Sequence, residues 1–200
     1  MNIVNANLKF RNLLKPLNIK NVRYIVIHHP EAITATPQDI HQWHIERGWS
    51  GGGYNEYIRK DGTVYILRGD NIGAQCDKYN SVSYGICCEG DYGKEQTMPQ
   101  AQFNALVERC KFHLNRFSNC KVVGHGELNP TACPGKFFPL GMVKNAVNSK
   151  VVASPLTIEE ALKIVSDKSG IDYSVWLQQS KQIKWLDSCF IKIAQAMKEV

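Results

Sequence analysis

The chain has 200 residues, enough for one good-sized core or for one domain with a small appendage. It is 44% hydrophobic and 21% charged, as in soluble globular proteins, and no apolar run is long enough for stable membrane insertion. The net charge of +6 favours an anionic partner surface, but the absence of a basic stripe with interleaved aromatic residues argues against nucleic acid.

The N-terminal segment and the cysteines indicate where the protein is made. Residues 1–20 lack the apolar core and cleavage site of a secretory signal, and they predict an irregular lead-in. The seven cysteines are irregularly spaced and include no CxxC pair, which predicts reduced thiols rather than a disulfide scaffold. We therefore expect synthesis in a cytoplasm without a signal peptide.

The first regular elements are predicted to be a strand and a helix. The β-branched and aromatic run 22–27 is typical of a buried strand, and it is followed directly by His28. A helix is expected over 37–47, because Thr36 can cap its first turn and Gly48 can end it.

The middle of the chain alternates strands and helices. Residues 54–59 and 63–68 flank a Lys-Asp-Gly turn and predict a hairpin. A further strand is expected over 83–88, an amphipathic helix over 99–117 and a short strand over 121–124. This pattern predicts an α/β fold with a central mixed β-sheet flanked by helices.

The pattern changes near residue 145. We expect a main domain over 1–147, a linker over 148–156 and a small helical module over 157–200. The module begins with a capping box at Thr157 and continues as apolar stripes at helical spacing. Because so short a unit rarely holds a core alone, we expect it to dock on the first domain, form a homo-oligomer or bind a target.

Three potential metal ligands follow predicted strands. His28 and His125 stand where strands end, and Cys133 lies in the next loop. Imidazole and thiolate are zinc ligands, and a catalytic zinc keeps one position for water, whose pKa it brings down to about 7. The spacing is not a zinc-finger pattern, so structural histidines and an inert cysteine remain the alternative. His28 and His29 would point to opposite faces of a strand, so one of them faces the site.

Three segments carry a family resemblance: YIVIHHPE (24–31), GWSGGGYNEYIRKDGTVYILR (48–68) and VVGHGELNPTACPG (122–135). They resemble the type 2 N-acetylmuramoyl-L-alanine amidases, which include phage endolysins and animal peptidoglycan recognition proteins. The resemblance spans roughly residues 20–145 and implies that fold. It also implies zinc ligation by the equivalents of the family's two histidines and one cysteine, which are His28, His125 and Cys133. The complete ligand set implies an enzyme rather than a recognition protein.

The resemblance assigns further roles. It places Tyr54 beside the zinc, where its phenol can hydrogen-bond a water or a developing oxyanion, although packing in the core explains this residue equally well. Thr131 stands where some relatives have lysine, so its hydroxyl would be a weaker oxyanion donor than a cation. Asn80 is expected to contact the stem peptide of the substrate.

Several polar residues have two interpretations. Glu127 is either a partner of the site, as an orienting group or general base, or a solvated loop carboxylate. His41 and His44 are three residues apart on one helix and suggest a metal pair, but packing is favoured for them, as it is for His29 and His113.

The implied function is hydrolysis of peptidoglycan at the amide bond between the N-acetylmuramic acid lactyl group and L-alanine, by a water that Zn²⁺ activates. The implied enzyme is a phage or prophage endolysin that accumulates in the host cytoplasm and acts on the cell wall after release. The alternatives are a non-catalytic peptidoglycan-binding module, a thiol hydrolase using Cys133 and His125, and a protein that regulates a partner through its C-terminal helices.

Overall fold

The computed structural model describes residues 2–149, 158–170, 172, 174 and 175. The chain divides into two compact units, Met1–Asn148 and Ser149–Val200. In the described part of the second unit, helix α4 (Ile158–Ser169) ends at Gly170, which has a φ of 71°. No helix among the described residues is long and apolar enough to cross a membrane.

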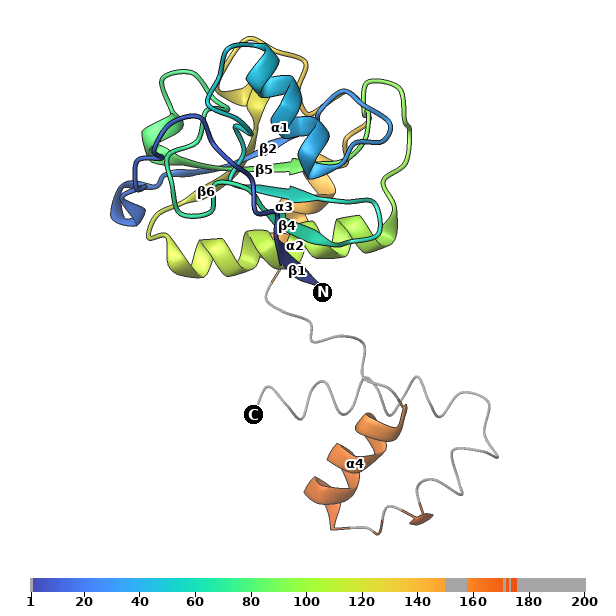
Figure 1. Ribbon diagram of the computed structural model, residues 1–200. Helices are drawn as coiled ribbons and strands as arrows, with labels where there is room; N and C mark the ends of the chain where they lie inside the picture. Colours follow the sequence, from blue (N-terminus) through green and yellow to red (C-terminus); the bar gives the residue numbers. More distant parts are fainter. Residues whose placement is uncertain (1, 150–157, 171, 173, 176–200) are drawn as a thin grey trace. The chain divides into compact units, whose positions relative to one another are not determined.

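The first unit is built on a six-stranded mixed sheet with the order β1-β4-β3-β5-β2-β6 (Figure 1). Only β3 and β4 pair antiparallel, and the other neighbours are parallel. The predicted central mixed sheet is therefore confirmed. The strands are β1 (Ile3–Asn5), β2 (Tyr24–His28), β3 (Glu56–Ile58), β4 (Val64–Ile66), β5 (Ser83–Cys88) and β6 (Lys121–Gly124).

Helices cover both faces of the sheet. They are α1 (Pro37–Glu46), α2 (Gln100–Arg116) and α3 (Leu140–Asn148), with short 3-10 turns at Ile19–Asn21, Asn80–Val82 and His125–Glu127. In Figure 1, α1 lies above the sheet and α2 lies below it.

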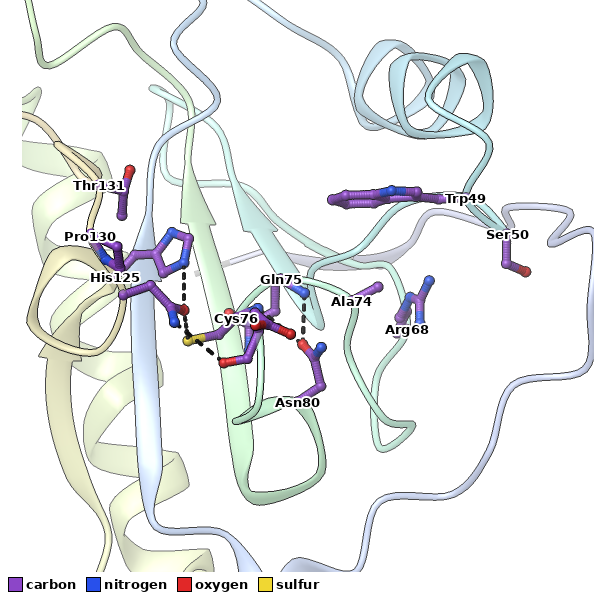
Figure 2. A pocket seen from close by; sticks show the side chains of 12 residues that line it. Trp49, Ser50, Arg68, Ala74, Gln75, Cys76, Asn80, His125, Pro130 and Thr131 are labelled. Carbon is purple, nitrogen blue, oxygen red and sulfur yellow. Dashed lines mark hydrogen bonds between the residues drawn. The ribbon is translucent and has the colours of Figure 1, made fainter.

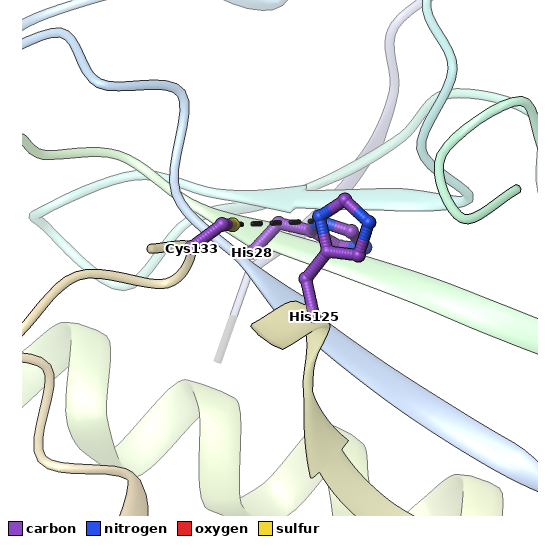
Figure 3. A group of neighbouring side chains, drawn as sticks. All are labelled: His28, His125 and Cys133. Carbon is purple, nitrogen blue, oxygen red and sulfur yellow. Dashed lines mark hydrogen bonds between the residues drawn. The ribbon is translucent and has the colours of Figure 1, made fainter. Parts of the chain in front are cut away.

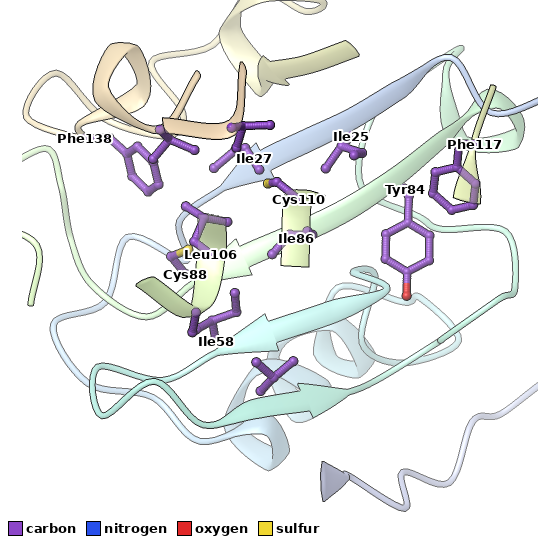
Figure 4. Packing of buried hydrophobic residues seen from close by; sticks show 14 of the residues in the cluster. Ile25, Ile27, Ile58, Tyr84, Ile86, Cys88, Leu106, Cys110, Phe117 and Phe138 are labelled. Atoms are coloured by element: carbon purple, nitrogen blue, oxygen red, sulfur yellow. The ribbon is translucent and has the colours of Figure 1, made fainter. Parts of the chain in front are cut away.

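The central strands bury side chains on both faces, as parallel strands covered by helices do. On one face, Ile25 and Ile27 of β2 belong to the same cluster as Leu106 of α2 (Figure 4). On the opposite face, Tyr57 of β3 packs with Ile40 of α1. Two apolar layers therefore hold the sheet between its helices.

Local sequence signals explain most of the element boundaries. Thr36 caps α1 through a capping box, because its hydroxyl accepts the Asp39 N–H at 3.1 Å while the Asp39 carboxylate accepts the Thr36 N–H at 2.8 Å. The predicted hairpin is present as β3 and β4, with shorter strands than expected.

Two elements were not predicted. The N-terminal lead-in contains β1, a strand at the edge of the sheet beside β4, and a strand of three residues has a weak local sequence signal. Helix α3 was also missed, because Gly141 lowers helix propensity and packing of Val143 and Val147 in the shared core stabilises the helix instead. The expected helical stripes beyond residue 175 lie outside the described residues.

Candidate metal centre and its pocket

The fold brings three potential ligands to one edge of the sheet. β2 and β6 are parallel neighbours with Ile27 opposite Gly124, so His28 and His125 leave the sheet side by side. Cys133 approaches them from the loop that follows (Figure 3). The ligand atoms of His28, His125 and Cys133 all lie within 4.8 Å of one another.

The donor set fits a zinc ion. His28 Nδ1 lies 3.6 Å from Cys133 Sγ. Zinc bonds of about 2.0–2.1 Å to nitrogen and about 2.3 Å to sulfur place two tetrahedral ligands about 3.5 Å apart. Two imidazoles and one sulfur also leave the fourth position of a tetrahedral ion open, which is the arrangement of catalytic rather than structural sites.

Burial keeps the three candidate ligands uncharged when no cation is present. Burial, together with neighbouring His125, lowers the pKa of His28 to about 3, and burial also lowers the pKa of His125. Burial raises the pKa of the Cys133 thiol to about 12. Both rings therefore offer a lone pair at neutral pH, and the thiol needs a nearby cation to ionise.

The second ring nitrogen of each histidine meets a side-chain amide. His28 Nε2 hydrogen-bonds the amide oxygen of Gln75, and His125 Nε2 lies 3.2 Å from the amide oxygen of Asn129. Neither amide was identified from the sequence, because Gln75 lies outside the three segments that carry the resemblance and Asn129, within 122–135, was given no role. Only the distances show that both amides border the candidate ligands.

A cavity of about 770 Å³ opens beside the candidate ligands. Figure 2 shows His125 and Thr131 at one end and Trp49 and Arg68 at the other, with Asn80 along the wall. Its size suits a pocket for a small organic group or a short peptide. The cavity thus unites three residues that the sequence singled out, namely His125, Thr131 and Asn80.

Tyr54 lies next to the metal-ligand candidates. Its ring centroid is 5.1 Å from that of His28 and 5.4 Å from that of His44. Burial raises the pKa of Tyr54 well above its ordinary value, so the phenol stays protonated and can act as a hydrogen-bond donor. Tyr54 therefore packs against neighbouring rings and also lies close to the candidate ligand His28.

Thr131 and Asn80 already make hydrogen bonds within the protein. The Thr131 hydroxyl accepts the Cys133 N–H at 3.2 Å, which ties the loop to its ligand. The Asn80 side-chain oxygen accepts the N–H groups of Gln75 at 2.8 Å and of Cys76 at 3.0 Å. Asn80 thus has a clear structural task in addition to its place in the pocket wall.

His41 and His44 hold the glycine-rich turn that precedes Tyr54. His41 Nδ1 accepts the Gly52 N–H at 3.1 Å, and His44 Nδ1 accepts the Gly53 N–H at 2.8 Å. A side chain at Gly51 would meet the His41 ring at 2.3 Å, which explains a glycine there. These contacts support the structural interpretation of both histidines.

Glu127 and His113 also have structural partners. The Glu127 carboxylate accepts the Gly124 N–H at 2.7 Å and pairs with Lys144 of α3 at 2.8 Å. His113 lies fully buried and hydrogen-bonds Glu56 at 2.8 Å. Glu127 therefore stabilises the turn that carries His125.

A profile of the N-acetylmuramoyl-L-alanine amidase family matches residues 18–136, which include all three candidate ligands. The chain belongs to this family. Family membership agrees with the resemblance seen in the sequence.

Known proteins support the assignment to the amidase family. The chain is 35% identical over 128 residues to peptidoglycan-recognition protein LB of Drosophila melanogaster, a match that spans 56% of this chain and 54% of that protein. It is 34% identical over 102 residues to an endolysin of Klebsiella phage KP32, covering 48% of this chain and 68% of the endolysin.

The fold of this family member matches a solved amidase structure. N-acetylmuramoyl-L-alanine amidase LysC from Clostridium intestinale superposes with a TM-score of 0.69 at 32% sequence identity. The match covers 75% of this chain and 99% of that structure. The α/β fold inferred from the sequence is therefore the fold of the family.

Proposed function

We propose that this protein is a zinc-dependent amidase that hydrolyses the bond between the N-acetylmuramic acid lactyl group and L-alanine in peptidoglycan. The observation that carries the proposal is the convergence of His28, His125 and Cys133 beside an open cavity, in a chain of the amidase family. Bound zinc would polarise the substrate carbonyl and lower the pKa of a water so that it can attack.

The residues around the ligands fit this chemistry. The protonated phenol of Tyr54, beside His28, can donate to negative charge that develops on the carbonyl oxygen. The Thr131 hydroxyl lies in the cavity wall near His125 and is a second, weaker donor. Asn80 lines the same cavity, where we assign it to the stem peptide of the substrate.

A thiol hydrolase explains the geometry less well. A nucleophilic cysteine needs a lowered pKa, whereas burial raises the pKa of Cys133 to about 12. A thiol mechanism also gives no role to His28, which lies 3.6 Å from the sulfur. A metal ion accounts for both residues, because it ionises the thiol and uses the lone pair of the ring.

Similarity to a peptidoglycan-recognition protein supports a second candidate function, which is binding of peptidoglycan without hydrolysis. The two functions differ in a direct assay. We expect the purified protein to carry zinc and to release new amino termini from bacterial cell walls. EDTA should abolish this release and added zinc should restore it, whereas wall binding without release would identify a recognition protein.

The decisive variant is Cys133→Ser. We expect it to lose zinc and hydrolysis together while its circular dichroism spectrum stays that of a folded protein. Cys120→Ser makes the same change at a half-buried thiol outside the candidate ligand set and should retain zinc and activity. Hydrolysis by metal-free Cys133→Ser protein would refute the zinc mechanism.

The phage relatives support a more specific role as an endolysin. In this role, the protein accumulates in the host cytoplasm and reaches the wall when the membrane is breached. Cells that express it should lyse only after permeabilisation of the membrane, and turbidity measurements report this directly. The C-terminal module would then bind the wall or join copies of the chain into an oligomer.

A further inference from the structure

Each nitrogen of the His28 ring faces a different side chain. Nδ1 lies 3.6 Å from Cys133 Sγ, and Nε2 hydrogen-bonds Oε1 of Gln75. A neutral imidazole has one N–H and one lone pair, and an amide oxygen can only accept. The contact with Gln75 therefore places the proton on Nε2 and leaves the lone pair of Nδ1 directed toward the other candidate ligands.

The Gln75 amide is itself oriented by a second contact. With Oε1 toward His28, its NH₂ group donates to Ser83 Oγ at 2.7 Å. Gln75 is 7% exposed and Ser83 on β5 is fully buried, so the chain of contacts has little access to water. A buried amide that lost these partners would leave polar atoms unsatisfied, which favours the observed arrangement.

The surrounding backbone makes room for Gln75 and holds it. A Cβ atom at position 85 of β5 would lie 2.8 Å from Cγ and Cδ of Gln75, so a glycine at this position leaves space for the Gln75 side chain. The Asn80 side-chain oxygen accepts the Gln75 N–H at 2.8 Å and fixes the backbone from the other side. The stretch from Asn80 to Gly85 thus holds the Gln75 amide against His28.

We propose that Gln75 is a positioning residue for the metal centre: its amide oxygen holds His28 in the tautomer and ring orientation that present Nδ1 to zinc. The inference rests on the proposed zinc site. Partners of this kind orient metal-ligating histidines, and their removal typically lowers metal affinity about 10- to 100-fold. Asn129 faces His125 in the same way, but it is half-buried, so water can replace it more easily.

The test compares zinc affinity among full-length variants by competition with a chromophoric chelator. Gln75→Leu keeps the approximate size of the side chain but removes the acceptor, and we expect zinc binding to weaken by about tenfold or more. Gln75→Glu retains an acceptor and should restore most of the affinity. Nitrogen NMR of the metal-free protein should show the Nε2–H tautomer of His28 in the parent and a mixture of tautomers in Gln75→Leu.

Gln102→Leu is the matched control, because Gln102 is also a buried amide but donates to the carbonyls of Ile58 and Glu89 instead. It should lose stability but keep the zinc affinity of the parent. If Gln75→Leu does not fold, Gly85→Ala displaces the amide without removing it and should also weaken zinc binding.

The outcomes separate this inference from the proposed function. A parent protein that binds no zinc would refute the metal centre and the inference with it. Zinc affinity that is unchanged in folded Gln75→Leu, or reduced equally in Gln102→Leu, would overturn only the positioning role of Gln75.

Discussion

At the candidate metal centre, removal of one hydroxyl group can test whether a residue acts in hydrolysis without contributing to zinc binding. Tyr54→Phe keeps the ring that packs beside His28 and His44 but removes the hydroxyl. If this phenol stabilises the oxyanion, hydrolysis should fall about 10²- to 10³-fold while zinc content stays unchanged. Release of amino termini from cell walls and metal analysis measure the two effects.

Tyr65→Phe removes a hydroxyl from a half-buried tyrosine on β4 and serves as the control. It should hydrolyse cell walls at the rate of the parent. A fully active Tyr54→Phe would show that Tyr54 contributes packing alone.

A buried ion pair ties the hairpin strand β3 to α2. Glu56 is fully buried and accepts hydrogen bonds from Arg109 Nε at 2.9 Å and from His113 at 2.8 Å. Glu56→Gln would leave the Arg109 charge buried without its partner, so we expect a loss of about 3–5 kcal/mol in the free energy of unfolding. Urea denaturation followed by circular dichroism measures this loss.

The exposed ion pair between Asp70 and Arg116 provides a comparison for the buried pair. Asp70 Oδ2 lies 2.7 Å from Arg116 Nη2. Asp70→Asn should change the free energy of unfolding by about 0–1 kcal/mol, because solvent screens both charges. Equal losses in Asp70→Asn and Glu56→Gln would contradict the distinction between buried and exposed pairs.

Among the elements, α1 offers a test of a local signal. Thr36→Ala removes the hydroxyl that accepts the Asp39 N–H and should cost about 1 kcal/mol of stability. Thr36→Ser retains the oxygen and should recover most of that loss. Chemical denaturation of both variants provides the measurement, and an equal loss in the two would show that the methyl group, not the cap, matters.

For the whole molecule, acid should weaken the fold through Glu56. Burial by itself would raise the pKa of this carboxyl, but hydrogen bonds from Arg109 and His113 lower it to about 2, from 4.5. A lowered folded-state pKa stabilises the protein above the unfolded-state value, and this contribution is lost as the pH falls from about 4.5 to about 2. Unfolding measured across this range should show a smaller pH dependence in Glu56→Gln, and the same dependence in both proteins would exclude Glu56 as the cause.

The division of the chain into units predicts that the metal centre needs only the first one. Residues 1–148 contain His28, His125 and Cys133 together with the sheet that positions them. A fragment of these residues should unfold cooperatively and bind zinc with the affinity of the full chain. Weaker binding by a folded fragment would show that the second unit supports the site.

The sequence alone was sufficient to predict the elements whose signal lies in neighbouring residues. A β-branched and aromatic run marked β2, and Thr36 marked the start of α1. The three candidate ligands were found because they follow strands and belong to motifs in a fixed order, and parallel pairing of β2 with β6 then explains why they meet.

Only the tertiary structure revealed the elements and contacts that depend on segments far apart in the sequence. β1 is held by pairing with β4, and α3 by its place in the core shared with α2, so neither has a strong signal of its own. Gln75 is the clearest case: it lies in a loop, its partners lie on β2 (His28) and β5 (Ser83 and Gly85), and its amide acquires a role only when the fold brings them together. Residue type and the resemblance to the amidase family predicted which side chains could bind a metal, whereas packing across the sheet determined how those side chains are oriented.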